Sequence, residues 1–141
     1  MKDIANQTMF EIQDIALKSK QYADNAIQDL GLSAQQGRII NYIYTHQNQS
    51  VSQKELADHF NVSTASIGGS LKVLEKYNYI ERTKRNDNAR QYQIVVLPKG
   101  ESIIQDFEEK MSNLYQEFST FLTEDEFKSL LSLLTQLKSK F

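Results

Sequence analysis

The segment SQKELADHFNVSTASIGGSLKVL, residues 52–74, decides the fold expected for this chain. Its first residue, Ser52, is a preferred N-cap, and Glu55 stands where a capping box places its reciprocal side chain. After a tight turn, Ser63 can cap a second helix in the same way. Two short capped helices separated by a tight turn predict a helix-turn-helix, whose second helix projects outward.

The residues around this segment predict a mostly α chain with a small β part (α+β). Apolar residues recur at spacings of three and four, and the 141 residues include only one proline and five glycines. The period changes to two only beyond the second helix, where two strands should flank a polar loop. The predicted elements are helices over 3–30, 33–46, 53–60 and 63–77, strands over 79–83 and 91–96 around a loop at 84–90, and helices that begin at Pro98 and after Thr123.

The second helix of the pair and the polar loop carry side chains suited to duplex DNA. Hydroxyl groups bind phosphates or base edges, an alanine methyl can contact a thymine methyl, and lysine neutralises phosphate. A positive loop on a β-ribbon suits a wing that contacts phosphates or the minor groove, although a solvated hairpin would look similar. The predicted DNA-contacting residues are Gln53, Lys54, Ser63, Thr64, Ala65, Ser66 and Lys72 in the helices, and Lys84, Arg85 and Arg90 in the wing.

Two adjacent glycines, Gly68 and Gly69, stand in the same helix. Each costs about 1 kcal/mol of helix stability relative to alanine. Close approach to DNA would explain the pair, and simple tolerance of glycine explains it equally well.

Charge is unevenly distributed along the chain. Residues 52–99 hold eight of the 16 Lys and Arg residues but only five of the 18 Asp and Glu residues, so this part is basic in a chain of net charge −2. A basic middle between acidic flanks is a modest indication of phosphate contact, and chance patterning of solvated faces would also produce it.

Several classes of protein and site are disfavoured. There is no cysteine, which excludes disulfides and thiol redox sensing, and His46 and His59 lack metal-ligand spacing. No metal, no cofactor and no catalytic constellation is expected, so the chain should not be an enzyme. Without a signal sequence or a membrane-length apolar run, it is expected in the cytoplasm.

The chain resembles the MarR family of transcriptional regulators. The residues that carry this resemblance are the segments LSAQQGR (32–38), VSQKELA (51–57), VSTASI (62–67), LEK (74–76), YIER (79–82) and LPKG (97–100). The resemblance implies a winged helix-turn-helix that binds DNA as a homodimer, with Arg90 as the minor-groove contact of the wing. Two positions depart from the family pattern, because Asn88 replaces the acid that helps to brace this arginine and Leu97 replaces a capping threonine.

This resemblance divides the chain into three parts. Residues 1–31 form an N-terminal dimerisation helix, residues 32–97 form the DNA-binding lobe with a recognition helix at about 63–77 and a wing at about 84–91, and residues 98–141 form the C-terminal dimerisation helices. Apolar stripes in the last part favour a dimer independently, although a monomer core could also hold them. Their members are Phe107, Met111, Leu114, Phe118, Phe127, Leu130, Leu134 and Phe141.

The expected function is sequence-specific binding of a pseudo-palindromic double-stranded operator, as a repressor that a small aromatic or amphipathic ligand releases. Many relatives hold such a ligand between the dimer arms and the DNA-binding lobe. The candidate ligand residues are Phe10, Tyr22, Arg38, Tyr42 and His46. The alternative is a winged-helix module that contacts another protein and does not bind DNA.

Overall fold

The computed structural model describes residues 1–47, 51–85 and 88–141, and at residues 84, 85 and 88–92 it describes the backbone only. Within these residues the prediction of a mostly helical chain with a small antiparallel sheet is confirmed. No described helix is long and apolar enough to cross a membrane. The elements are α1 (Lys2–Ala26), the 3-10 helix η1 (Gln28–Leu30), α2 (Ala34–Thr45), α3 (Gln53–Phe60), α4 (Thr64–Lys76), β1 (Ile80–Arg85), β2 (Asn88–Val96), α5 (Pro98–Phe118) and α6 (Glu124–Lys138).

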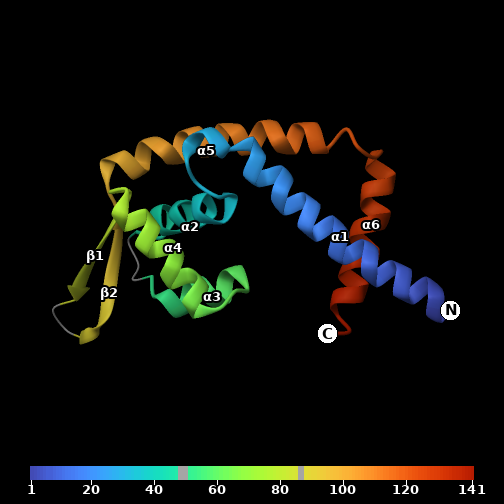
Figure 1. Ribbon diagram of the computed structural model, residues 1–141, viewed down its shortest axis with the longest axis horizontal. Helices are drawn as coiled ribbons and strands as arrows, with labels where there is room; N and C mark the ends of the chain where they lie inside the picture. The colour runs from blue at the N-terminus through green and yellow to red at the C-terminus, as the bar shows by residue number, and fades with distance from the viewer. Residues whose placement is uncertain (48–50, 86–87) are drawn as a thin grey trace.

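The chain forms a lobe and two extended arms (Figure 1). Helix α5 runs along the top of the view, and α2, α3, α4 and the β1–β2 hairpin lie beneath its first half. Helix α6 descends from the far end of α5 and α1 from near its middle, so that both termini lie far from the hairpin. The DNA-binding elements predicted from the sequence are therefore grouped in one part of the molecule.

The lobe has its own apolar core, which forms because each of its helices carries apolar residues on one face. Burial of each such large side chain stabilises the fold by about 1.5–3 kcal/mol. The fully buried members from the helices are Ile39, Ile40 and Ile43 of α2, Leu56 of α3, and Ile67, Leu71 and Leu74 of α4.

A second core joins the end of α1 to α2 and α5. Phe107, Met111 and Leu114 of α5 pack there with Ile27, so this part of the apolar stripe belongs to the monomer. Gly37 of α2 lies directly against the Phe107 ring, where an added Cβ would be 2.3 Å from the ring carbon Cε2. The missing side chain therefore allows α2 and α5 to pack closely.

The remaining apolar residues of the arms have no such cover. Helix α6 has no buried residue, and Leu131 and Phe141 are 66% and 92% exposed. On α1, Ile4, Phe10 and Ile15 are exposed as well. The monomer-core explanation therefore holds for Phe107, Met111 and Leu114 of α5, and for the exposed apolar residues of α6 the dimer stays a prediction.

The hairpin joins α5 through a short, tightly packed connection. Leu97 is the N-cap of α5 but makes no side-chain cap bond, and Pro98 occupies the first turn. The Leu97 N–H instead donates to the Tyr79 carbonyl at 2.9 Å. Gly100 lies against this carbonyl, so the joint depends on a residue without a side chain.

Three details of the predicted elements are wrong. Helix α1 ends at Ala26 rather than at Leu30, because the chain turns at Ile27 and places this side chain in the core. The predicted loop at 84–90 is largely strand, since β1 extends to Arg85 and β2 begins at Asn88, with a shift of register between Lys84 and Arg85.

The third difference concerns the capping box predicted at Ser52. The Ser52 hydroxyl accepts the Glu55 N–H at 3.0 Å as expected. The Glu55 carboxylate, however, accepts from the Tyr42 hydroxyl at 3.4 Å instead of completing the box. A tertiary contact has replaced a local one.

Candidate nucleic-acid interface

The helix-turn-helix is formed by α3, a turn and α4. Asn61 ends α3 in the left-handed conformation with φ of +54°, and the Val62 N–H donates to the Ala57 carbonyl at 3.0 Å. The Ser63 hydroxyl then accepts the Ser66 N–H at 3.0 Å and starts α4. The turn and the start of the second helix are therefore both determined by local hydrogen bonds.

The outward face of α4 is polar and small. Its buried residues, Ile67, Leu71 and Leu74, face the lobe core. Among the predicted DNA-contacting residues, Gln53 is half-buried and the others of the two helices are exposed: Lys54, Ser63, Thr64, Ala65, Ser66 and Lys72. The fold thus brings the two helix starts together on one accessible surface.

The glycine pair has two different environments. An added Cβ at Gly69 would have no described atom within 4 Å, whereas one at Gly68 would meet the side-chain amide of Gln53. At Gly68 the Gln53 side chain fills the space that a Cβ would take. For Gly69, close approach to DNA and simple tolerance of glycine both stay open as explanations.

The wing is the β1–β2 hairpin. Its register pairs Ile80 with Val96 and Lys84 with Tyr92. An ion pair between Arg82 of β1 and Glu75 of α4 ties the hairpin to the recognition helix. The side chains of the predicted wing contacts Lys84, Arg85 and Arg90 lie outside the described residues, so their DNA contacts stay predictions.

An aromatic cluster fills the contact between α2 and the helix-turn-helix. The ring of Tyr42 stacks on His46 with centroids 3.9 Å apart and lies 4.3 Å from the ring of His59. Burial, with the nearby Glu55 carboxylate, raises the pKa of the Tyr42 hydroxyl, which therefore remains a hydrogen-bond donor. Tyr42 thus packs α2 on α3, and the ligand role predicted for Tyr42 and His46 stays a prediction.

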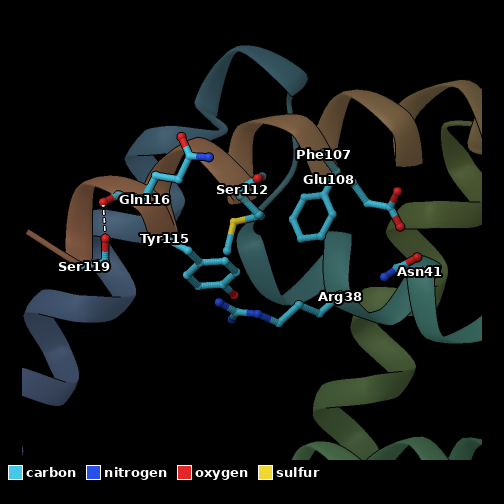
Figure 2. Close-up of a pocket in the computed structure, with 9 residues that line it drawn as sticks. Arg38, Asn41, Phe107, Glu108, Ser112, Tyr115, Gln116 and Ser119 are labelled. Atoms are coloured by element: carbon cyan, nitrogen blue, oxygen red, sulfur yellow. Dashed lines mark hydrogen bonds between the residues drawn. The ribbon is translucent and has the colours of Figure 1, made fainter. Parts of the chain in front are cut away.

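A cavity of about 680 Å³ opens between α2 and α5 (Figure 2). Arg38 of α2 and Tyr115 of α5 point toward one another in it, and the ring of Phe107 forms part of its wall. The cavity therefore combines apolar walls with polar groups available to a small molecule.

Only Arg38 of the five predicted ligand residues lines this cavity. Phe10 is exposed on the arm α1, and Tyr22 packs against Phe121 beyond α5. The polar residues of α5 that line the cavity were not predicted from the sequence. These residues recur every three or four positions beside the buried apolar residues, and this spacing could have indicated that they share one face of the helix. They are Glu108, Ser112, Tyr115, Gln116 and Ser119.

Comparisons with known proteins agree with this architecture. The MarR family model matches residues 32–92. A solved structure from Clostridium acetobutylicum, assigned to the MarR family of transcriptional regulators, is 38% identical and covers 96% of this chain and 98% of its own, with a TM-score of 0.61. The MepR–DNA complex of Staphylococcus aureus is 22% identical, covers 94% of this chain and 97% of its own, and has a TM-score of 0.85.

A curated relative agrees over part of its length. The HTH-type transcriptional regulator BilQ of Clostridioides difficile (strain CD3) is 26% identical over 96 residues, which are 68% of this chain and 65% of that protein. The match thus spans less than two thirds of the relative. Together with the full-length likeness to the Clostridium acetobutylicum structure, these findings show that the chain belongs to the MarR family of transcriptional regulators.

Proposed function

We propose that the protein binds a pseudo-palindromic operator in double-stranded DNA as a homodimer and represses transcription until a small ligand releases it. The observation that carries the proposal is the exposed polar face of α4, held outward by the buried Ile67, Leu71 and Leu74. A helix presented in this way fits the major groove. The solved MepR–DNA complex, which shares this fold, supports the same use of it here.

The contacts divide into two kinds. Thr64, Ala65 and Ser66, in the first turn of α4, are placed to contact base edges. Gln53, Lys54, Ser63 and Lys72 lie around them as phosphate contacts, and Lys84, Arg85 and Arg90 extend the contact through the wing. The protein thus acts by binding rather than by catalysis, and it acts in the cytoplasm, where bacterial DNA lies.

The second copy would cover the apolar arms. Single monomers seldom expose large contiguous apolar surfaces, and α1 and α6 expose such residues at the same end of the molecule (Figure 1). A two-fold dimer built from residues 1–31 and 98–141 would leave the lobes, residues 32–97, at its ends. Its two recognition helices would then meet half-sites about one helical turn apart. The exposed apolar residues are Ile4, Met9, Phe10, Ile15 and Leu17 of α1, and Leu130, Leu131, Leu133, Leu134, Leu137 and Phe141 of the C-terminal arm.

The cavity between α2 and α5 is the proposed site of the releasing ligand. It joins the lobe to the arm, so its occupancy can alter their relative orientation. The two recognition helices must be correctly spaced to bind DNA. A ligand therefore releases the protein only if it binds more tightly to the state in which this spacing does not fit DNA. Arg38 and Tyr115, with the apolar wall of Phe107, suit a small aromatic or amphipathic molecule with a polar group.

Selection of bound duplexes from a random DNA pool tests this proposal directly. We expect enrichment of a pseudo-palindrome, bound by two chains. Affinity should fall on the order of a thousandfold or more between 50 and 200 mM salt if the dimer neutralises several phosphates. If no duplex is bound even at low salt, the proposal fails, and a protein-contacting module would be favoured instead.

A further inference from the structure

The Gln53 side chain occupies the space that the missing side chain of Gly68 leaves free. An added Cβ at Gly68 would lie 2.8 Å from Nε2 of Gln53 and 3.7 Å from its Cδ. The first of these distances is too short for atoms that are not bonded to one another. The neighbouring Gly69 has no described atom within 4 Å of the same position, so the arrangement belongs to Gly68 alone.

A hydrogen bond holds the Gln53 amide in this position. Its Nε2 donates to the Thr64 carbonyl at 2.7 Å. Thr64 is the first residue of α4, and Gln53 is the first residue of α3. The amide therefore joins the starts of the two helices directly, and we call this contact the Gln53 seat.

We propose that the Gln53 seat positions the recognition helix, so that sequence selectivity depends on a side chain outside that helix and on the glycine beneath it. The inference rests on the proposed function, because it requires α4 to enter the major groove. Hydrogen bonds to base edges weaken steeply with distance and angle. Attraction between lysine and phosphate is less directional, so a tilt of α4 should reduce selective binding more than non-selective binding.

The Gly68→Ala change separates positioning from simple structural support. Alanine favours a helix more than glycine does, and the displaced group is the end of a flexible side chain. The gain in helix preference and the loss of the bond from Gln53 to Thr64 are similar in size, so the substitution should leave thermal stability nearly unchanged while it lowers selectivity. A purely structural role would lower selectivity only together with stability.

The experiment compares the wild-type protein with Gln53→Ala, Gly68→Ala and the double variant. For each protein, the dissociation constant is measured for the duplex that the wild type selects from a random pool and for a scrambled duplex of equal composition. Melting temperature is measured at one chain concentration. In the DNA-free wild type and in Gly68→Ala, hydrogen exchange of the Gln53 side-chain amide is followed by NMR.

We expect each single change to lower the ratio of selected to scrambled affinity on the order of three- to tenfold, the effect of one hydrogen bond. Gly68→Ala should leave the melting temperature nearly unchanged in the wild-type background and raise it by a few degrees in the Gln53→Ala background, where no bond is lost. In the Gln53→Ala background it should not lower the ratio further, because no amide remains to be displaced. Amide exchange at Gln53 should be slow in the wild type and faster in Gly68→Ala.

Two results would overturn the inference while the proposed function stands. One is an equal loss of selectivity from Gly68→Ala in both backgrounds, which would mean that the added methyl group itself obstructs DNA. The other is unchanged amide exchange in Gly68→Ala. If the wild type enriches no duplex at all, the proposed function is overturned, and the inference with it.

Discussion

Replacing Gly100 with alanine adds one methyl group at the joint between the hairpin and α5. The new Cβ would lie 2.3 Å from the Tyr79 carbonyl oxygen and 2.8 Å from Cγ1 of Val96. A carbon atom and a carbonyl oxygen normally approach to about 3.3 Å. Either α5 or the hairpin must therefore move by about 1 Å relative to the other.

The size of the effect follows from three contributions. Overpacking of an interior costs about 1–3 kcal/mol. The shifted carbonyl also weakens its bond from the Leu97 N–H, which adds about 0.5–1.5 kcal/mol. The preference of alanine for a helix offsets about 1 kcal/mol. We expect Gly100→Ala to lower the free energy of unfolding by about 0.5–3.5 kcal/mol.

Urea unfolding followed by circular dichroism measures this change, at one chain concentration because association contributes to stability. Gly69→Ala is the matched control, since its Cβ meets no described atom within 4 Å. It should raise the free energy of unfolding by about 0.5–1 kcal/mol. If Gly100→Ala is as stable as the wild type with an unchanged m-value, the close packing at this joint does not exist in solution.

The remaining predictions concern DNA contact, assembly and pH. Arg90→Ala should weaken binding to selected and scrambled duplexes alike, by about tenfold, whereas Thr64→Ala should change which sequence a random pool yields. Equal losses on both duplexes for both variants would contradict this division between backbone contact and base readout. Leu134→Lys places a charge in the proposed dimer contact and should shift the mass measured by analytical ultracentrifugation toward the monomer, and an undiminished dimer would argue that α6 lies outside the contact. The Lys110 ammonium, 2.9 Å from Asp29, lowers the pKa of that carboxyl below its ordinary 3.8 by a hydrogen bond and by its charge. This exposed pair therefore contributes stability above that ordinary pKa and loses it as the pH falls through the lowered value. Lys110→Ala should be slightly less stable than the wild type near neutral pH and equal to it in strong acid. A difference in stability that persists in acid would contradict the assignment.

Much of the lobe could be predicted from the sequence because its signals are local. The hydroxyls of Ser52 and Ser63 accept N–H groups three residues later, as the N-cap pattern predicts. The apolar spacing in α4 likewise corresponds to its inner face, where Ile67 and Leu74 are buried. Such interactions join residues within one helical turn, so their geometry is contained in the order of the residues.

The candidate site was predicted less completely, because part of it depends on contacts between distant residues. The cavity takes Arg38 from α2 and Tyr115 from α5, and no spacing within either segment brings them together. Glu55 likewise satisfies the capping pattern in sequence, yet its carboxylate binds Tyr42 instead.

The helix-turn-helix that decides the fold illustrates both sides. The sequence by itself determined the two helices, their caps and the turn, since each depends on hydrogen bonds between near neighbours. Only the tertiary structure decided why Gly68 and Gly69 differ, because Gln53 reaches one and not the other. Identical residues in adjacent positions have identical local preferences, and only the packing of α3 on α4 gives them different neighbours.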